Sequence, residues 1–468
     1  MEGKGLLRSQ VDPALKALRP GVRRRSLTCG VLVSDEAGRF VLEPHGLADQ
    51  ENLSPFGYAD RLGALAGRYL QARRRSVSSE LDYLILVPTL RCNLACSYCQ
   101  VSRAALGARQ HDWSDETLGH VLDLVSGLRA RAVKIEFQGG EPTLRPDLIA
   151  KVIAAVPPGV DALFVICTNL QTIDDTILAI FDRDDVLIST SLDGPLELHA
   201  RQRSDTEQTR RFAENFRFLL DRYGPNKISA LPTVDPSHPP RPADLVDAFA
   251  AFGMRSIYLR PINFQGFARK NHSAAREIGE AWSDYHRSFI RYLVERNWQD
   301  RGRVFEETYF SLILRRIFRP GSNRHVDLRN PNPMGQDYIV IDHDGTAYPT
   351  DEARMLTRAG IIDLSIGDVA SGWQTEKRAA LNAASTNDGD PACETCAYKP
   401  FCGRDIVDDI SRYGTTSLPR HETEFCRRHL ALFDFAFEMI HSDSDKTRYS
   451  LGHWLNLPGP FPRVVAVS

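Results

Sequence analysis

The sequence predicts an α/β protein: a partial (β/α)6 TIM-type barrel, preceded by a small α+β module and followed by a cysteine-rich module. Six short apolar runs alternate with segments of helical periodicity between residues 81 and 300. This alternation is typical of a parallel sheet with right-handed crossovers. In addition, seven of the nine cysteines fall into two groups, one just after the first apolar run and one near the C-terminus.

The length and composition limit the class of protein. A chain of 468 residues is too long for one ordinary core, so we expect a main domain with smaller modules. Its 58 basic and 60 acidic residues leave a net charge of −2, which gives no reason to expect a nucleic-acid or membrane partner. The first residues contain no secretory apolar region, and no apolar run approaches the roughly 20 residues that span a bilayer. We therefore expect a cytoplasmic protein, in which clustered cysteines are more often metal ligands than disulfides.

Residues 1–80 are expected to form the N-terminal module. Thr28–Val33 and Arg39–Leu42 predict a hairpin across a turn at Asp35–Gly38. A helix should follow, because Leu62, Leu65, Tyr69 and Leu70 share roughly one helical face.

Residues 81–300 are expected to form the barrel. The predicted strands are Tyr83–Val87, Val133–Phe137, Leu163–Cys167, Val186–Ser191, Ile228–Val234 and Ser256–Arg260. The predicted helices between them are Ser114–Leu128, Asp147–Val156, Thr172–Phe181, Glu207–Tyr223 and Ala243–Phe252. A long amphipathic helix over Ala275–Trp298 should close this region.

Three further segments are expected after the barrel. Residues 301–335 form a helical connection. Residues 336–430 hold a hairpin of Tyr338–Asp342 and Ala347–Tyr348 around an Asp-Gly turn, followed by cysteine-rich loops. Residues 431–468 complete a helix near His429–Ile440 and end in an extended tail.

The first cysteine group has the spacing C-x3-C-x2-C, formed by Cys92, Cys96 and Cys99 directly after the first predicted strand. The carboxyl ends of barrel strands are where catalytic residues gather. Three thiolates can hold three corners of a cubane cluster and leave the fourth iron open, and an open position distinguishes a catalytic metal centre from a structural one. Zinc is the alternative, with His111 as a nearby fourth ligand.

This loop, together with Phe137-Gln138-Gly139-Gly140-Glu141-Pro142-Thr143 after the second strand, resembles the radical S-adenosylmethionine (SAM) superfamily. The resemblance implies that the open iron of a 4Fe–4S cluster chelates SAM and that one electron cleaves it to a 5′-deoxyadenosyl radical. It implies that Tyr98 packs near the adenine and that Gly139, Gly140 and Glu141 bind the SAM amino group. Glycines let a backbone approach a ligand closely, and a carboxylate pairs with an ammonium.

Two further strand ends resemble polar positions of the same superfamily. There the resemblance implies that Asn169, Ser191 and Asp193 face the ribose or methionine part of SAM, and that Arg203 pairs with its carboxylate. A local role in caps or turns is the alternative for these four residues. The remaining two cysteines, Cys29 and Cys167, are expected to have no ligand; Cys167 should pack in its strand as a small apolar residue.

The second cysteine group has the spacing C-x2-C-x5-C-x23-C, formed by Cys393, Cys396, Cys402 and Cys426. Four thiolates close either a zinc site or a fully ligated 4Fe–4S cluster, and spacing does not decide between them. The segment resembles the SPASM extension of peptide-modifying radical SAM enzymes, which usually carries seven cysteines for two auxiliary clusters. Here Thr350 stands where one of those cysteines would be, so the resemblance implies one auxiliary 4Fe–4S cluster, for electron transfer or bracing.

Asp351 and Glu352 follow that substituted position. In sulfatase-maturing relatives an aspartate beside the cysteine is a proposed proton acceptor, and Asp351 matches it, with Glu352 as a second candidate acid or base. The alternative is a helix start, in which Thr350 caps and the two acids occupy the first turn.

Three segments together resemble maturases of His-Xaa-Ser-type peptide systems: Tyr348–Met355, Cys99–Arg103 and Phe137–Leu144. The resemblance covers roughly residues 80–430. The resemblance implies a ribosomally synthesised precursor peptide as substrate, modified by cross-linking or C–H functionalisation, and a flavodoxin- or ferredoxin-type electron donor. The N-terminal module would then be a candidate for binding a leader peptide by strand addition. Two alternatives stay open: an anaerobic sulfatase maturase that oxidises a protein Cys or Ser, and a zinc-binding structural or adaptor protein.

Overall fold

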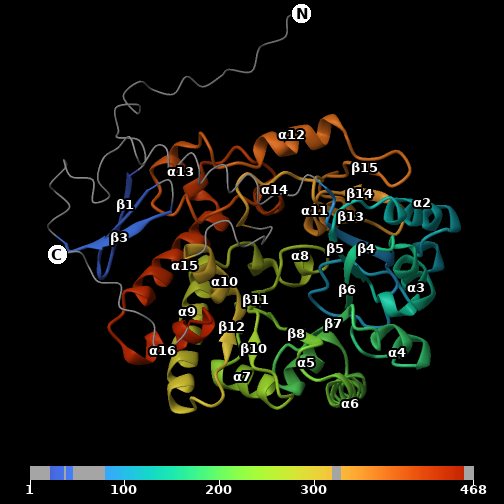
Figure 1. Cartoon of the computed structure of the whole chain (residues 1–468), viewed down its shortest axis with the longest axis horizontal. Helices are drawn as coiled ribbons and strands as arrows, with labels where there is room; N and C mark the ends of the chain where they lie inside the picture. The colour runs from blue at the N-terminus through green and yellow to red at the C-terminus, as the bar shows by residue number, and fades with distance from the viewer. Residues whose placement is uncertain (1–21, 36–37, 46–79, 319–327, 458–468) are drawn as a thin grey trace, which may run out of the picture.

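A computed structural model describes residues 22–35, 38–45, 80–318 and 328–457 (Figure 1). The helix expected over Leu62–Leu70 and the tail after residue 457 lie outside the described residues. Among the described residues, no helix combines the length and the apolar character that crossing a membrane requires.

The centre of the molecule is an eight-stranded sheet in the order β15-β14-β13-β4-β5-β6-β7-β8. Strands β13 to β8 run parallel, as the alternation of strands and helices predicts. The five central strands of the barrel are β4 (Tyr83–Thr89), β5 (Ala132–Gly139), β6 (Asp161–Cys167), β7 (Val186–Ser191) and β8 (Ile228–Leu231). These strands lie within one or two residues of the segments predicted for them, apart from Ile228–Val234, which the structure divides.

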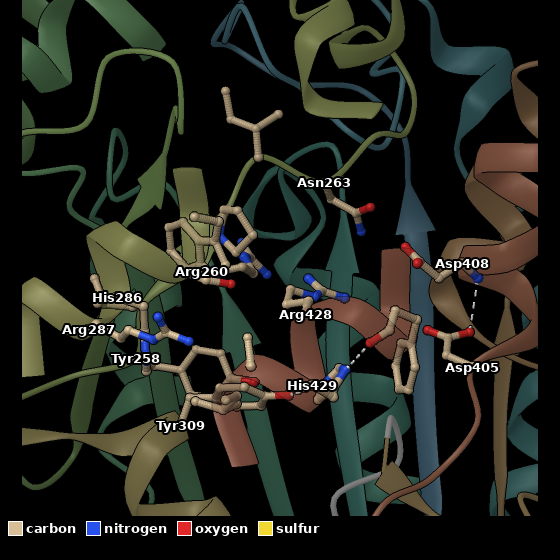
Figure 2. A pocket seen from close by; sticks show the side chains of 18 of the residues that line it. Tyr258, Arg260, Asn263, His286, Arg287, Tyr309, Asp405, Asp408, Arg428 and His429 are labelled. Carbon is tan, nitrogen blue, oxygen red and sulfur yellow. Dashed lines mark hydrogen bonds between the residues drawn. The ribbon is translucent and has the colours of Figure 1, made fainter. Parts of the chain in front are cut away.

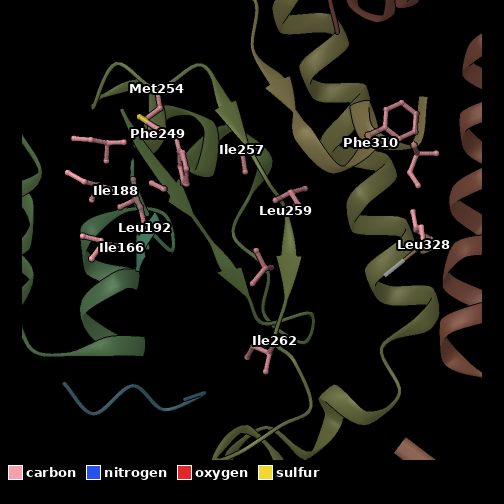
Figure 3. Close-up of a cluster of buried hydrophobic side chains, with 14 of the residues drawn as sticks. Ile166, Ile188, Leu192, Phe249, Met254, Ile257, Leu259, Ile262, Phe310 and Leu328 are labelled. Carbon is pink, nitrogen blue, oxygen red and sulfur yellow. The ribbon is translucent and has the colours of Figure 1, made fainter. Parts of the chain in front are cut away.

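Side-chain alternation gives the sheet two different faces. On one face, apolar side chains are buried against the surrounding helices, among them Ile135 and Phe164. Figure 3 shows Ile166 and Ile188 of this face. On the other face, alternate residues such as Glu136, Val165 and Ser189 line a cavity. The sheet therefore separates an apolar core from a polar interior.

Helices cover the outer face of the sheet and begin where the sequence supplies caps. The side chains of Ser114, Asp174 and Asp205 each accept a hydrogen bond from a backbone N–H in the first turn of the helix that follows. The helices of this layer are α2 (Asp115–Ser126), α3 (Pro146–Ala155), α4 (Asp175–Phe181), α5 (Leu196–Arg203), α6 (Thr206–Tyr223) and α7 (Pro242–Ala250). Short 3-10 turns lie at Arg109–His111, Pro142–Leu144, Ser273–Arg276 and Arg420–Glu422.

The sixth predicted barrel strand is interrupted. Only β10 (Ser256–Ile257) and β11 (Arg260–Pro261) form, and both lie outside the eight-stranded sheet. β11 pairs with β9 (Thr233–Val234), while β10 pairs with β12 (Glu306–Glu307). At the break between β10 and β11 the Leu259 N–H donates to the Glu307 carboxylate at 2.9 Å instead of to a neighbouring strand. Pro232, which lacks an N–H, separates β8 from β9 in the same way. The barrel is consequently irregular on this side.

Long helices pack beside this irregular edge. The predicted amphipathic helix is confirmed as α9 (Gly279–Gln299), which buries Trp282, Phe289 and Leu293. It contacts α15 and α16. The neighbouring helices are α8 (Ala268–Asn271), α10 (Thr308–Phe318), α15 (Glu424–Ile440) and α16 (Asp445–Trp454).

The predicted C-terminal hairpin forms and joins the barrel sheet. Strand β13 (Tyr338–Ile341) pairs with β14 (Thr346–Tyr348) across a turn in which Gly345 has φ +88°, a conformation that favours glycine. β13 also pairs in parallel with β4, so the region after residue 335 is hydrogen-bonded directly to the barrel. The remaining elements there are α11 (Asp351–Arg358), β15 (Gly367–Asp368), α12 (Glu376–Ala384), α13 (Pro391–Thr395) and α14 (Ile406–Tyr413).

The N-terminal module is a three-stranded antiparallel sheet of β1 (Val22–Leu27), β2 (Gly30–Asp35) and β3 (Phe40–Glu43). The predicted hairpin corresponds to β2 and β3. This sheet lies against the C-terminal region beside α13 and α15 (Figure 1). Arg25 forms an ion pair of 2.6 Å with Asp434, and the Phe40 ring meets Phe437 edge-on at 5.0 Å. The N-terminal sheet is therefore held against α15.

Candidate active site

Three thiols converge in the loop that follows β4. Cys92, Cys96 and Cys99 are half-buried and free of disulfides. Burial raises the pKa of Cys92 to about 12, and the charges of Cys96 and Cys99 add to that shift. Thiols this close together and this well shielded need a bound cation to become thiolates. The loop therefore fits a metal cluster, of which its three thiols would supply three of four corners.

The loop is anchored by an ion pair behind it. Arg91 donates two hydrogen bonds of 2.7 Å to the carboxylate of Asp112, which also accepts one of 2.6 Å from Thr89. Both charged side chains are largely buried, with exposed fractions of 12% and 9%. Bidentate geometry of this kind restricts orientation as well as adding energy. The backbone that carries Cys92 is thus held at both ends of the strand-to-loop turn.

Gly139 and Gly140 allow the end of β5 to approach the cysteine loop. A Cβ on Gly139, whose φ is +138°, would lie 2.1 Å from the Thr89 carbonyl oxygen. A Cβ on Gly140 would lie 2.2 Å from the carbonyl oxygens of Leu90 and Arg91. No side chain can be accommodated at such distances. The sequence predicts glycines near a ligand; in the structure their close neighbour is the loop, although both also line the cavity.

Glu141 connects the ends of β5 and β6. Its carboxylate accepts hydrogen bonds from the Thr143 hydroxyl at 2.7 Å and from the Asn169 backbone N–H at 2.7 Å. Burial raises the pKa of Glu141. The Asn169 side chain in turn donates to Asn93 at 2.7 Å and lies 3.7 Å from the Cys92 sulfur. Glu141 and Asn169 therefore border the cavity and also brace the cysteine loop.

Asp193 lies behind the site and positions two of its members. Its buried carboxylate accepts hydrogen bonds from the Tyr98 hydroxyl at 2.6 Å, from Arg203 at 2.9 Å and from the Thr233 backbone at 3.0 Å. The Arg203 guanidinium lies 5.2 Å from the Tyr98 ring centre. Tyr98 and Arg203 line the cavity, whereas Asp193 is not among its lining residues. The structure thus gives Asp193 three protein partners at the place where the sequence predicts a cofactor contact.

A cavity of about 920 Å³ opens beside the cysteines, at the carboxyl ends of the strands. It brings together most of the residues that the sequence predicts for the site. Its lining includes Cys92, Cys96, Cys99, Tyr98, Gly139, Gly140, Glu141, Asn169, Ser191, Arg203, Asp351 and Glu352. A space of this size is typical of small-molecule and cofactor sites.

The prediction that Cys167 packs as an apolar residue is wrong. Its thiol lines the cavity and donates a hydrogen bond of 3.3 Å to Glu136. The reason is the two-residue period of β6, in which Cys167 shares the inward face with Val165 while Ile166 enters the apolar core. Burial raises the pKa of Cys167 well above its usual range, so the thiol is neutral.

Asp351 and Glu352 occupy the first turn of α11 and also line the cavity. Thr350 caps this helix by accepting a hydrogen bond of 3.1 Å from the Ala353 N–H. Asp351 is buried and pairs with Arg354 at 2.7 Å. Burial raises the pKa of Asp351, and the pair with Arg354 opposes that shift. The helix-start interpretation and the cavity position are therefore both true of these residues.

The second cysteine group assembles from separate segments. Cys393 lies in α13, Cys396 directly follows that helix, Cys402 lies in the next loop, and Cys426 lies in the first turn of α15. Burial raises the pKa of Cys393, and the charges of Cys402 and Cys426 contribute to the shift. Cys402 is likewise influenced by Cys396 and Cys426. All four thiols are free, so the group fits a closed four-thiolate site.

Arg420 lies against this second group. Its side chain is 2% exposed, pairs with Asp409 at 2.7 Å and lies within electrostatic range of Cys393, Cys402 and Cys426. Its Nε has no hydrogen-bond partner among the described residues. A buried N–H without an acceptor is costly, and the sulfur atoms of a bound cluster would offer acceptors there.

Several residues at this site were not predicted from the sequence. Tyr258, Arg260, Asn263 and Asp405 line the cavity and also a smaller adjoining pocket (Figure 2). A weak signal exists in the alternation of Tyr258 and Arg260 with the buried Leu259. No signal precedes Asp405, whose position depends on how the C-terminal region folds back over the barrel.

Comparison with known sequences agrees with this geometry. Residues 86–247 match the family model of the Radical SAM superfamily. A GTP 3′,8-cyclase of Chlorobaculum tepidum is 34% identical over 115 residues, which are 24% of this chain and 31% of that protein. An uncharacterized protein of Methanothermobacter thermautotrophicus is 30% identical over 132 residues, which are 26% of this chain and 47% of that protein. The chain thus spans less than half the length of these relatives.

Solved structures share the fold over a longer stretch. The structure of polyhistidine-tagged anSMEcpe with bound AdoMet has a TM-score of 0.60 at 18% identity, covering 76% of this chain and 96% of that one. Native anSMEcpe with AdoMet and Cp18Cys peptide gives 0.59 at 18% identity, covering 76% and 97%. Streptococcus suis SuiB bound to precursor peptide SuiA gives 0.52 at 12% identity, covering 86% and 98%. Residues 86–247 therefore form a radical SAM domain by their match to the family model, and the solved structures show that the chain around it shares their fold.

Proposed function

We propose that this protein is a radical SAM enzyme that cleaves SAM reductively and modifies a ribosomally synthesised precursor peptide. One observation carries the proposal: three free thiols on a single loop border a cavity of about 920 Å³ inside a radical SAM domain. Three protein ligands leave one iron of a cubane open for a chelating cosubstrate.

The residues around the cavity suit that cofactor pair. Cys92, Cys96 and Cys99 would hold a 4Fe–4S cluster, which with bound SAM supplies a 5′-deoxyadenosyl radical. Tyr98 and Arg203, locked by Asp193, would border the bound SAM. Gly139, Gly140, Glu141, Asn169 and Ser191 would complete its binding surface, as their positions on the cavity wall allow.

Asp351 and Glu352 are the proposed proton acceptors. Both enter the cavity from α11, on a segment that the sheet pairing of β13 ties to the barrel. Asp351 is held in place by Arg354, so its carboxylate has a defined orientation. A positioned carboxylate can take the proton released when a substrate radical is oxidised or forms a new bond.

Cys393, Cys396, Cys402 and Cys426 would hold one auxiliary 4Fe–4S cluster. None of the four lines the large cavity, so direct contact between this cluster and the substrate is not part of the proposal. Its proposed task is electron transfer, with a flavodoxin- or ferredoxin-type protein as the external donor.

A peptide substrate is supported by the size of the cavity and by the shared fold with two structures described as peptide complexes. The three-stranded N-terminal sheet, whose outer strands are β1 and β3, is the proposed site for a leader peptide that adds a strand. Cross-linking and C–H functionalisation are the proposed reaction types.

The test is anaerobic incubation of reconstituted protein with SAM, dithionite and a candidate precursor peptide. We expect 5′-deoxyadenosine and a change in peptide mass. Asp351→Asn should lower modified peptide by about 100-fold while 5′-deoxyadenosine stays within about twofold, because proton acceptance follows SAM cleavage. Asp443→Asn, whose side chain is 93% exposed and far along the chain from the site, is the matched control. Absence of 5′-deoxyadenosine from the wild type would refute the function, and full product formation by Asp351→Asn would refute the role of that residue.

A further inference from the structure

We propose that the smaller pocket beside the SAM cavity, lined by Arg260, Arg287 and Arg428, binds a carboxylate of the peptide substrate. The carboxylate is either an acidic side chain or the C-terminus of the peptide. This inference rests on the proposed function, because it names the feature of the substrate that the site selects.

The pocket has a volume of about 150 Å³ and adjoins the reaction space. Five residues line both the pocket and the large cavity: Tyr258, Arg260, Asn263, Glu352 and Asp405. A group held in the pocket therefore lies next to the wall that carries Glu352, and a peptide can extend from it into the cavity.

Two of the arginines lack partners within the described part of the chain. The side chains of Arg260 and Arg428 make no hydrogen bond there and lie within 4.0 Å of no carboxylate, and the Arg428 Nε is buried. Arg287 has one loose contact, at 3.9 Å from Asp284. Figure 2 shows the guanidinium groups of Arg260 and Arg428 pointing into the same open space. Arg260 and Arg428 are both half-buried, and the shielded Nε of Arg428 has no acceptor among the described residues, which an anion in the pocket would supply.

The acidic side chains near the pocket form their close contacts with residues other than Arg260 and Arg428. Asp408 pairs with Arg412 at 3.0 Å. Asp405 caps α14 by accepting from the N–H groups of Val407 and Asp408. Burial lowers the pKa of Arg428, while the charges of Asp408, Tyr309, Glu424 and Asp405 raise it, with a net rise. These are interactions at longer range, because no carboxylate of the described residues forms an ion pair with Arg428, and the arginine that Glu424 contacts is Arg427, at 3.7 Å. The lining residues carry four arginines and three carboxylates. The fourth arginine is Arg412, and the carboxylates are those of Glu352, Asp405 and Asp408.

The arginines come from three different elements with rigid surroundings. Arg260 belongs to β11, Arg287 to α9 and Arg428 to α15. Arg428 lies 6.0 Å from the ring centre of Phe425, and Tyr309 hydrogen-bonds to His429 at 2.7 Å beside it. Because the walls are packed, little ordering remains to be done when a ligand enters. Planar guanidinium groups converging on one space match the geometry of a carboxylate.

The experiment uses full-length reconstituted protein with SAM and without reductant, so that no turnover occurs. Three synthetic pentapeptides are titrated by ligand-observed NMR: acetyl-AGEGA-amide, acetyl-AGQGA-amide and acetyl-AGQGA with a free C-terminal carboxylate. We expect one or both of the carboxylate peptides to bind about tenfold more tightly than the neutral one, as a charge-assisted contact requires. The acidic side chain and the free C-terminus are thereby tested as separate arms.

Arg428→Gln and Arg260→Gln should each abolish this preference, and Arg428→Lys should keep part of it, since charge without the planar fork is weaker. Arg211→Gln, whose side chain is 53% exposed on α6, should leave it unchanged. Thermal unfolding and iron content verify that each variant is folded. Equal binding of the three peptides, or a preference that survives both Gln variants, would overturn the proposal. Because 5′-deoxyadenosine formation is measured separately, loss of the proposed function and loss of this pocket's role give different results.

Discussion

The two groups of cysteines differ in how the chain brings them together. Cys92, Cys96 and Cys99 lie within one loop and border a cavity of about 920 Å³. The group from Cys393 to Cys426 spans three segments, and Cys396 and Cys402 pack against the apolar core. The first group is arranged by local backbone, whereas the second exists only once α13 and α15 have come together.

This difference indicates that the two groups suit different tasks. An incomplete ligand set beside open space can bind a further molecule, whereas a complete set enclosed by packed side chains cannot without losing a ligand. The first group also has polar residues from several strand ends around it. The second has Arg420 and the aromatic rings of Tyr398, Phe401 and Phe433 close to its segments.

The largest effect should separate the two groups directly. Cys92→Ala should reduce 5′-deoxyadenosine formation to background, because the loop then supplies two ligands instead of three. Cys402→Ala should leave most SAM cleavage intact but lower the iron content by about half, since each group would hold a cluster of equal size. Iron analysis and 5′-deoxyadenosine assays on the two variants provide the measurement.

The opposite pattern of activities in the two variants would contradict the distinction between the two cysteine groups. If Cys402→Ala abolishes SAM cleavage in dithionite-reduced protein that keeps its first cluster, SAM cleavage requires the second group, and the two groups do not have separate roles. If Cys92→Ala retains the cleavage activity, the open site is not in the loop after β4.

A smaller effect should show how tightly the loop is built. Gly140→Ala should lower the free energy of unfolding by about 3 kcal/mol or more, because its Cβ would lie 2.2 Å from two carbonyl oxygens that cannot move independently. Gly119→Ala is the matched control, since its Cβ meets nothing within 4 Å in α2, and there alanine should stabilise by about 0.5–1 kcal/mol. Chemical denaturation of both variants measures the difference; equal stabilities would show that the loop yields easily.

The smallest effect concerns the support behind the first group. His199 accepts a hydrogen bond of 3.4 Å from the Asp193 N–H, stacks on Phe212, and has its pKa lowered to about 4 by burial. The ordinary pKa of histidine, 6.5, applies to the unfolded chain. As the pH drops below that value, the unfolded chain takes up a proton that the folded protein does not, so the free energy of unfolding decreases. Between pH 7.5 and 5.5 this should cost about 1 kcal/mol in the wild type and not in His199→Gln.

Urea unfolding of both proteins at the two pH values isolates this contribution, because the pH dependence of all other groups cancels in the difference. A wild type and a His199→Gln variant that lose stability equally on acidification would show that His199 is not held neutral by the fold.

Sequence patterns are sufficient for the parts of the molecule that local chemistry dictates. Strand and helix periodicity predicts the parallel sheet and its covering helices, because buried faces repeat with fixed spacing. The cysteine loop and Gly139-Gly140-Glu141 can be recognised from the sequence alone. The spacing of cysteines within one loop and the presence of two adjacent glycines are both local properties of the chain.

Other features depend on contacts between residues that are far apart in the sequence, so their positions are known only from the three-dimensional structure. Pairing of β13 with β4 carries Asp351 to the cavity, and Asp193 is turned toward Tyr98 and Arg203. Cys167 faces the cavity because of its register in β6. Arg260 and Arg428 line the same pocket because α15 packs beside the interrupted edge of the barrel. The physical reason is that burial and pairing are properties of a three-dimensional neighbourhood, which a one-dimensional pattern does not specify.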